Sequence, residues 1–270
     1  MRLTVIALAL ITLGLSCQKN TVTGRKQLIL LNEQELQQMS NQEYRSFLSK
    51  NKVVSNAGSR DREMVMTVGK RISEAVQRYV AAQGKPELLQ GYAWEFNLVD
   101  SREVNAWCMP GGKVVVYTGL LPIARNDTGL AVVMGHEIAH AVARHGNERM
   151  SQSLLQQMGG VALAVAVANK PAETQSIFMD AYGIGSSVGG TLPFSRKHEL
   201  EADRYGLIFA AMAGYDPRAA IAFWERMAKA SEGQKPAEMF STHPSDETRI
   251  AKVREYAQEA MQYYKPIGKQ

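Results

Sequence analysis

The chain has 270 residues, 45% of them hydrophobic, and a formal net charge of +5 at pH 7. This length and composition suit one medium-sized globular domain together with a targeting segment. The basic residues are spread along the chain and no nucleic-acid-binding motif is evident, so we expect no nucleic-acid partner.

The first residues have the pattern of a secretory signal. A charged Met1-Arg2 precedes an apolar run that ends at Ser16-Cys17 and is too short for a comfortable membrane span. A cysteine in this place is typical of a bacterial lipoprotein signal, although Gly14 stands where leucine is usual. We therefore predict a lipoprotein signal peptide over residues 1–16 and a lipidated tether over residues 17–31, with the lipid on Cys17. An ordinary cleaved signal and an uncleaved anchor are the alternatives.

Cys108 is the only other cysteine. If Cys17 carries lipid, no intramolecular disulfide can form, and stability must come from the core and bound metal. We expect Cys108 to be a buried small hydrophobe rather than a nucleophile.

Helical patterns come first in the domain. Asn32 with Glu35 resembles a capping box, which opens a helix that runs to about Leu48. Residues 61–83 carry apolar side chains at the spacing of an amphipathic helix, and Gly84-Lys85-Pro86 ends it.

The period then changes to that of strands. Trp94 to Val99 alternates as a half-buried strand, and Asn105 to Met109 and Val114 to Thr118 are two further strands. Pro110-Gly111-Gly112 predicts the turn between the last two. We expect the three to form a small antiparallel sheet beside the next helix.

That helix begins after an N-cap at Asn126 and ends near Gly146. The apolar run over residues 158–168 is too short for a membrane span and predicts a buried helix, with a contact at the membrane surface as the alternative. Residues 183–191 are rich in glycine and serine and predict a loop. Helical spacing returns over residues 196–213, and Asp216-Pro217 predicts the start of another helix.

Residues 136 to 140 read His136-Glu137-Ile138-Ala139-His140, an H-E-x-x-H motif. On a helix this spacing places two imidazoles one turn apart on one face, with a glutamate beside them. We therefore predict that His136 and His140 bind Zn²⁺ and that Glu137 is the general base of peptide-bond hydrolysis. An exposed helix with two surface histidines is the alternative.

A catalytic zinc usually has three protein ligands and one open position. Glu199 and Asp203 lie four residues apart on a predicted helix and therefore share a face. This spacing allows Glu199 to bind the metal while Asp203 accepts a hydrogen bond from a ligating imidazole. Glu201 is expected to point elsewhere. An exposed acidic helix start is the alternative.

The remaining three histidines carry no clear signal. His145 lies five residues past His140, off the ligand face, and we expect it and His198 to be surface or packing residues. His243 precedes a final predicted helix, and its spacing alone gives it no role.

Together these motifs resemble the HtpX and type-I CAAX prenyl protease family of zinc metallopeptidases, and more narrowly its soluble periplasmic lipoprotein members without repeats. The resemblance covers about residues 20–255 and rests on Val22-Thr23-Gly24-Arg25, Asn105-Ala106, Pro110-Gly111-Gly112, Thr118-Gly119-Leu120-Leu121, the H-E-x-x-H, Ser195-Arg196 with Glu199 to Asp203, and Thr242-His243-Pro244 with Arg249-Ile250. The multi-pass membrane helices of some members are not evident, so a membrane-embedded substrate is not implied.

The resemblance implies a mostly helical α+β fold over residues 32–265, a zincin-like (gluzincin) metallopeptidase domain with one zinc per chain. It implies the ligand set His136, His140 and Glu199, with Glu137 as base. It also moves His243 into the site, where it would assist transition-state charge or cap the open position.

The resemblance further implies that the Asn105 to Met109 region is an edge strand above the cleft. There Asn105 and Ala106 would bind an extended substrate through main-chain hydrogen bonds, as an added strand.

We therefore expect a zinc endopeptidase of the bacterial cell envelope, on its periplasmic side, which degrades misfolded or misassembled envelope proteins. Its expected partners are such proteins and the membrane, through the lipid on Cys17. Gln18 favours the outer membrane under the common sorting rule. The alternatives are a zinc-bound chaperone or assembly factor, with His243 blocking the open site, and a metal-dependent hydrolase of something other than peptides.

Overall fold

The computed structural model describes residues 17–56, 58–158, 195–230 and 247–268, together with residues 175, 177–179, 181–182, 239 and 243. The predicted signal peptide, the apolar run from residue 159 onward and the glycine-rich loop lie outside the described residues. Among the helices that are described, none has the length and apolar character needed to cross a membrane.

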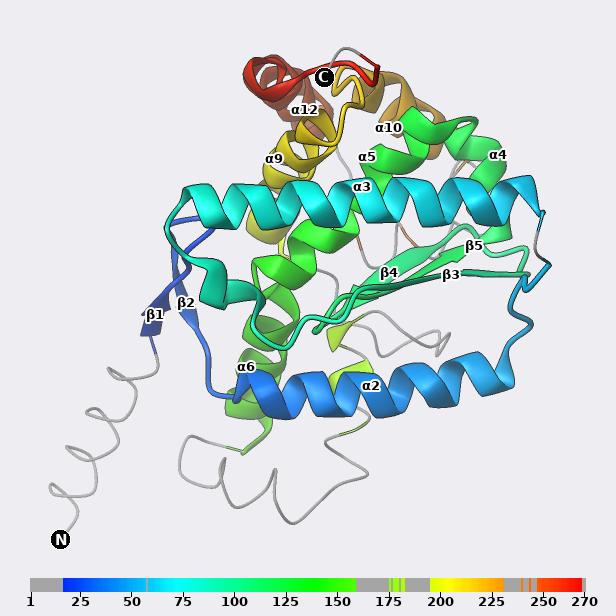
Figure 1. Ribbon diagram of the computed structural model, residues 1–270. Helices are drawn as coiled ribbons and strands as arrows, with labels where there is room; N and C mark the ends of the chain where they lie inside the picture. The colour runs from blue at the N-terminus through cyan, green and yellow to red at the C-terminus, as the bar shows by residue number, and fades with distance from the viewer. Residues whose placement is uncertain are drawn as a thin grey trace, which may run out of the picture.

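The described part of the chain is mostly helical, as predicted (Figure 1). The α-helices are α2 (Glu33–Lys50), α3 (Arg60–Ala82), α4 (Leu121–Ala124), α5 (Asp127–Val142), α6 (His145–Met158), α9 (Arg196–Met212), α10 (Ala219–Ala230) and α12 (Glu247–Ala260). Short 3-10 turns are η1 (Pro86–Leu89), η2 (Thr118–Leu120) and η3 (Met261–Tyr263). The predicted caps are present: the Asn32 side chain accepts from two backbone N–H groups of α2, and Asn126 accepts from the N–H of Gly129.

The end of α5 differs from the prediction. The helix ends at Val142, four residues before the predicted stop, and Arg144 adopts a left-handed backbone with φ of 55°. Gly146 lies inside α6 instead, where its lack of a Cβ makes room for the ring of Tyr182. The break at Arg144 changes the direction of the chain between α5 and α6.

The start of α10 also differs from the prediction. A tight turn precedes the helix, in which the carbonyls of Asp216 and Pro217 accept from the N–H groups of Ala219 and Ala220 at 3.2 Å. The helix proper therefore begins two residues after the proline.

A three-stranded sheet contains β3 (Glu95–Val99), β5 (Lys113–Tyr117) and β4 (Ala106–Met109), in that order. The tight turn at Gly111 and Gly112, both with positive φ, makes β4 and β5 antiparallel. The expectation of an all-antiparallel sheet is wrong for β3, which runs parallel to β5. The chain crosses the end of the sheet after β3, so β3 pairs with the far side of β5 rather than with β4.

Helices cover both faces of this sheet, as Figure 1 shows for α3 and α2. Successive strand residues point to opposite faces. Val114 and Val116 of β5 therefore join a core with α3 and α5, whereas Val115 and Tyr117 pack with Trp107 and α2. A strand that is buried on both faces has no polar side, which explains why β5 reads as an apolar run.

Residues 17–31, expected to be a tether, contain an ordered hairpin of β1 (Cys17–Lys19) and β2 (Lys26–Leu28). The Asn20 side chain donates to the carbonyl of Ala143 at 2.8 Å, and Gln27 donates to the same oxygen at 2.9 Å. Both bonds satisfy an orphan carbonyl at the C-terminal end of α5. The hairpin is thereby fixed to the junction between α5 and α6.

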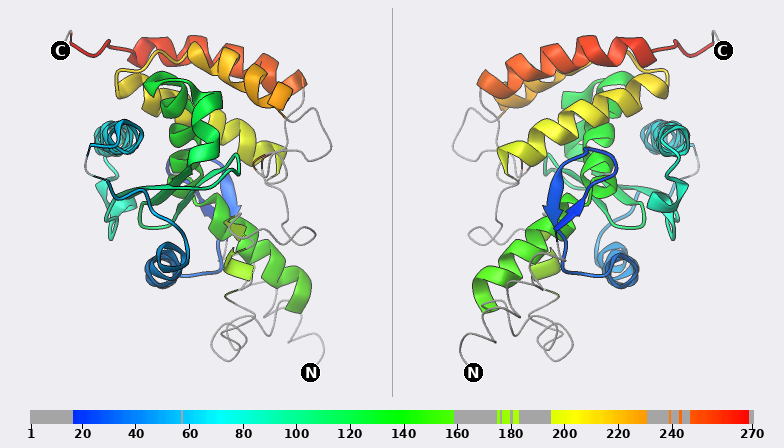
Figure 2. Two further views of the ribbon diagram at one scale, coloured as in Figure 1. Left: turned by 90° about the vertical axis from the view of Figure 1, so that its right-hand side faces the viewer. Right: turned by 90° about the vertical axis from the view of Figure 1, so that its left-hand side faces the viewer.

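Helices α5 and α9 cross at two glycines. A Cβ added to Gly206 would lie 2.7 Å from the backbone nitrogen of His136, and one added to Gly135 would lie 2.6 Å from the carbonyl oxygen of Gly206. This close backbone approach brings the first turns of α9 beside the H-E-x-x-H segment. Figure 2 shows α9, α10 and α12 gathered on the side of α5 away from α2.

We expect Gly206→Ala to lower both stability and metal affinity. Overpacking costs about 1–3 kcal/mol, and this methyl group would meet backbone atoms that cannot rotate away. The better helix propensity of alanine offsets about 1 kcal/mol, which leaves a net loss of up to about 2 kcal/mol. Urea unfolding and zinc titration measure the two effects. Lys197→Ala, an exposed change on the same helix, is the control, and equal results for the two variants would contradict the prediction.

Candidate metal centre

The H-E-x-x-H segment lies in the C-terminal half of α5 and is wholly buried. His136 and His140 are 1% and 4% exposed, and their Nε2 atoms lie 3.1 Å apart. Glu199, in the first turns of α9, is 0% exposed, and its Oε1 lies 3.3 Å from Nε2 of His140. The structure therefore brings together the three side chains that were predicted to hold zinc.

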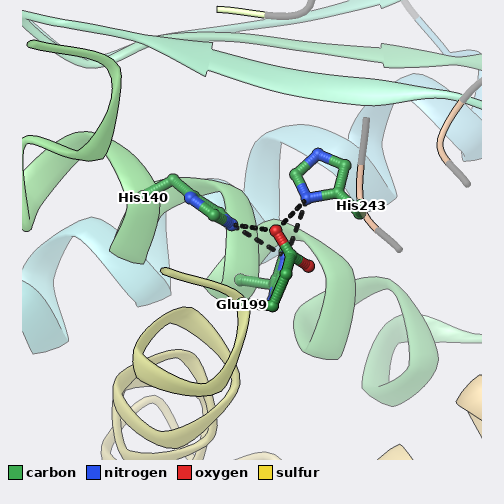
Figure 3. A group of neighbouring side chains, drawn as sticks. His140, Glu199 and His243 are labelled. Carbon is green, nitrogen blue, oxygen red and sulfur yellow. Dashed lines mark hydrogen bonds and ion pairs between the residues drawn. The ribbon is translucent and has the colours of Figure 1, made fainter. Parts of the chain in front are cut away.

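His243 completes this group. Its Nδ1 lies 3.2 Å from Nε2 of His136 and 3.0 Å from Oε1 of Glu199. One ligand atom from each of His136, His140, Glu199 and His243 lies within 4.8 Å of all the others. Figure 3 shows His140, Glu199 and His243 converging from different segments of the chain.

The donor set and its spacing fit zinc. Zn–N and Zn–O bonds of about 2.1 Å in a tetrahedron place neighbouring ligand atoms about 3.4 Å apart. The separations within the cluster that are given above run from 3.0 to 3.3 Å. Imidazole nitrogens and a carboxylate oxygen are also ligands that zinc takes. With zinc bound, Nδ1 of His243 would take the fourth corner of the tetrahedron, the position that a catalytic site leaves open.

Asp203 lies behind His136, as predicted from its spacing. Its Oδ1 is 2.9 Å from Nδ1 of His136, the nitrogen that faces away from the other ligands. Arg249 of α12 then holds Asp203 through Nε at 2.7 Å and through a terminal nitrogen at 2.9 Å. Burial raises the pKa of Asp203, but the charge of Arg249 more than offsets it, and the net pKa is below its usual value.

Arg249 was part of a motif but carried no predicted role. Besides Asp203, it reaches Oε2 of Glu199 at 2.8 Å and the carbonyl of His243 at 3.4 Å. Its guanidinium lies 4.1 Å from the centre of the Trp224 ring. The buried guanidinium of Arg249 therefore contacts three parts of the cluster. These are the Glu199 carboxylate, the Asp203 carboxylate behind His136, and the backbone of His243. The available signal in the sequence was that Arg249 follows His243 by six residues. Outside a helix or strand, however, such a spacing does not predict that two side chains are in contact.

Glu137 lies in the same buried region, 3% exposed. Burial, the largest effect, raises the pKa of its carboxyl group. Its Oε1 has no hydrogen-bond partner among the described residues and lies 3.6 Å from Nε2 of His243. A buried, unpaired carboxylate oxygen is costly unless a further group binds there, which fits a water molecule next to the metal.

His145 and His198 are not surface residues. Both are buried, and Nδ1 of His145 lies 3.0 Å from Nδ1 of His140. The expectation that His145 lies off the ligand face assumed a continuous helix. Because α5 ends at Val142 and the chain turns at Arg144, the side chain of His145 reaches His140 from a different direction. Burial lowers the pKa of His145 to about 4, so its ring is neutral at pH 7.

Asn105 and Ala106 lie where β4 forms an edge of the sheet. The backbone carbonyl of Asn105 accepts from Tyr117 of β5 at 3.1 Å. In an antiparallel ladder alternate residues bond to the partner strand, so the main-chain groups of Ala106 and Cys108 face away from β5. Both Asn105 and Ala106 are buried, at 3% and 1% exposed, and β4 contacts α5.

The two cysteines occupy very different places. Cys17 is the first residue of β1, and its side chain lies outside the described atoms. Cys108 is buried in β4, and burial raises the pKa of its thiol well above the usual value. Such a thiol is a poor nucleophile, in agreement with its expected role as a small hydrophobe.

A helix with two histidines one turn apart, a glutamate from a second helix and a small sheet beside the first helix define a zincin-like metallopeptidase domain. Residues 68–257 match Peptidase family M48, and the chain belongs to this family. Members of this family are zinc-dependent, which agrees with the donor set of the site.

The relatives of this chain include proteases of two kinds, one named as mitochondrial and the other named for β-barrel assembly. The chain is 38% identical to the mitochondrial metalloendopeptidase OMA1 of Schizosaccharomyces pombe over 191 residues, which are 70% of this chain and 53% of that protein. It is 31% identical to the beta-barrel assembly-enhancing protease of Escherichia coli over 170 residues, 61% of this chain and 34% of that protein. A putative protease of the same name from Vibrio cholerae is 34% identical over 170 residues, again 61% of this chain and 34% of that protein. The chain thus spans about half or less of the length of these relatives.

Proposed function

We propose that this protein is a zinc-dependent endopeptidase of the bacterial cell envelope that degrades misfolded or misassembled envelope proteins. The observation that carries the proposal is the buried cluster of His136, His140 and Glu199 with Glu137 beside it. A structural zinc site needs no neighbouring base, whereas a hydrolytic one does.

Each residue then has a role in the reaction. A zinc ion held by His136, His140 and Glu199 would polarise the scissile carbonyl and acidify water. Glu137 takes a proton from the attacking water and delivers it to the leaving amine. Its raised pKa suits this task, because the carboxyl group must hold the proton between the two steps. Asp203 would orient His136 through the 2.9 Å contact between its Oδ1 and Nδ1 of that ring.

The edge strand β4 supports binding of an extended peptide. Its main-chain groups at Ala106 and Cys108 face away from β5, on the side where an added strand would pair with the sheet. The side chain of Asn105 accepts from the N–H of Ala106 at 2.9 Å, so this side chain must turn aside when a peptide binds there. Main-chain recognition is independent of sequence and therefore suits a protease of unfolded substrates.

The envelope location rests on the signal-like N-terminus and Cys17. The names of the relatives include both a mitochondrial protease and proteases of β-barrel assembly. A lipid on Cys17 would attach the chain to the membrane at the first residue of the hairpin that packs beside the end of α5.

A second candidate function is a zinc-bound chaperone or assembly factor with latent or absent proteolysis. The observation in its favour is that Nδ1 of His243 would take the fourth corner of the site with zinc bound. His136, Glu137, His140, Glu199 and His243 are all at most 4% exposed, so no peptide can reach the cluster in this arrangement. The two candidates differ in whether His243 leaves that corner.

Purified protein lacking residues 1–17 tests the first candidate. It is expected to bind about one zinc per chain, to cleave casein, and to lose cleavage when a chelator removes the metal. Zinc binding without cleavage of casein or of any unfolded envelope protein would favour the chaperone. Proteomics of a Glu137→Gln variant, which should retain substrates that it cannot cut, would identify the physiological substrates.

We expect His243→Ala to raise proteolysis if His243 only caps the open position. The substitution frees the fourth corner while leaving His136, His140 and Glu199 in place. Casein cleavage by the variant and by wild type, at equal zinc content, is the measurement. A fall in cleavage would instead assign His243 to the transition state, and no cleavage by either protein would favour the non-enzymatic candidate.

A further inference from the structure

A second series of hydrogen-bonded polar side chains leads from the ligand His140 to Arg25. We propose that Arg25 is a positioning residue of the metal centre, which orients His140 through Glu201 and His145. The inference rests on the proposed zinc site and deepens it. Arg25 lies in the N-terminal hairpin, outside the residues 68–257 that match the family.

The hydrogen bonds run in one consistent direction. A histidine that binds metal through Nε2 carries its proton on Nδ1. Nδ1 of His140 therefore donates to Nδ1 of His145, 3.0 Å away. Because Nδ1 of His145 accepts this bond, the proton of its ring is on Nε2, which donates to Oε2 of Glu201 at 2.9 Å. Each bond has one donor and one acceptor, and the tautomer of each ring is thereby determined.

Arg25 fixes the far end of this series. Its Nε lies 2.6 Å from Oε1 of Glu201, and a terminal nitrogen lies 3.2 Å from Oε2. Its two terminal nitrogens also bind both oxygens of Glu148, at 2.8 and 2.6 Å. A planar guanidinium can hold two carboxylates in this way, whereas an ammonium group cannot match the geometry.

Glu148 is held in turn by a stack of rings. Its Oε2 accepts from Nε2 of His198 at 3.0 Å, and the His198 ring stacks on that of His145 at 4.6 Å between centroids. Without Arg25, Glu148 and Glu201 would face each other with no positive charge between them. Repulsion would then move Glu201 away and leave His145 without its acceptor.

The position of Arg25 itself is well determined. The turn that carries it is closed by bonds from the N–H of Gly24 to the carbonyl of Asn20 and from the N–H of Asn20 to the carbonyl of Arg25. Asn20 also donates to Ala143 at the end of α5. The hairpin therefore presents Arg25 at a constant distance from the helix that carries His140.

The other ligand histidine is supported in the same manner. Asp203 contacts the ring of His136, and Arg249 contacts Asp203 in turn. On the other side, the contacts lead from His140 to His145, then to Glu201 and finally to Arg25. Both carboxylates come from α9, on different sides of that helix. Each ligating imidazole is thus oriented by a carboxylate that an arginine holds.

The test compares Arg25→Ala, Arg25→Lys and the isosteric Glu201→Gln in the chain without residues 1–17. Zinc affinity is measured by competition with a chromophoric chelator, and the visible spectrum of the cobalt-substituted protein reports ligand geometry. We expect a 10- to 100-fold loss of zinc affinity, the usual effect of removing such outer contacts, together with an altered cobalt spectrum. Arg25→Lys should recover only part of the loss. In turnover, kcat should fall more than KM rises.

Two further comparisons keep the proposal falsifiable. Arg204→Ala, which removes an exposed arginine–glutamate pair on α9, should leave zinc affinity unchanged. The double variant of Arg25→Ala and Glu201→Gln should lose no more affinity than the stronger single variant. Wild-type zinc affinity and cobalt spectrum in Glu201→Gln, or additive losses in the double variant, would overturn the proposal. Zinc affinity tests the positioning role of Arg25 even if the wild-type protein cleaves no substrate. The proposed proteolytic function and the proposed role of Arg25 can therefore fail separately.

Discussion

Glu137→Gln is expected to abolish proteolysis while zinc binding is retained. Glutamine has the same shape but cannot take a proton from water, and loss of a general base costs roughly 10²- to 10⁴-fold in rate. His136, His140 and Glu199 are unchanged, so about one zinc per chain should remain bound. A fluorogenic casein assay and elemental analysis of the same preparation measure both quantities.

The matched control is Glu63→Gln, an exposed glutamate on α3 far from the site. It should retain full cleavage and full zinc content. Cleavage by Glu137→Gln at the wild-type rate would refute the proposed mechanism. Loss of its zinc would instead show that Glu137 supports the metal, and the loss of cleavage could then not be assigned to proton transfer.

Arg249→Ala is expected to cause the largest loss of stability. Arg249 is 3% exposed and is the common ion-pair partner of Glu199 and Asp203. Removing one partner of a buried ion pair costs about 3–5 kcal/mol, because the remaining charges stay buried without compensation. Asp203 would also cease to orient His136, so zinc affinity should fall by about 10- to 100-fold. Denaturant unfolding of the metal-free protein and zinc titration measure the two effects.

Two variants serve as comparisons for the stability loss that is expected of Arg249→Ala. Arg204→Ala removes an arginine that pairs in bidentate fashion with Glu259 but is 44% exposed, and such a pair contributes about 0–1 kcal/mol. Arg249→Lys keeps the charge but cannot reach Asp203 with two nitrogens, so an intermediate loss is expected. An Arg249→Ala protein that unfolds at the same denaturant concentration as wild type would contradict the interpretation of the buried network.

Local patterns were sufficient for most of the secondary structure. Caps such as Asn32 and Asn126 act within one turn, so the sequence alone indicates where α2 and α5 begin. Strand direction is not local. Whether β3 runs parallel or antiparallel to β5 depends on which edge of the sheet it joins, and both choices bury the same side chains. The prediction of an antiparallel sheet failed for this reason.

The residues of the metal centre divide in the same way, into those that local spacing predicts and those that only the fold brings together. Residues on one helix face, such as His136 with His140 and Glu199 with Asp203, follow from helical spacing. Arg249 and Arg25 come from distant segments, and their importance arises from charge placed in a buried region. His145 was misread because the early end of α5 depends on Arg144 adopting a left-handed backbone, which no residue preference favours.

The sequence by itself determined the class of chemistry, because the H-E-x-x-H spacing and the Glu199–Asp203 spacing operate within single helices. Only the tertiary structure decided which side chains contact those residues and that His243 lies in the same cluster. Helical geometry is repeated every turn and is therefore encoded locally. The packing of α5 against α9 and of the hairpin against both depends instead on close contacts between segments far apart in the chain.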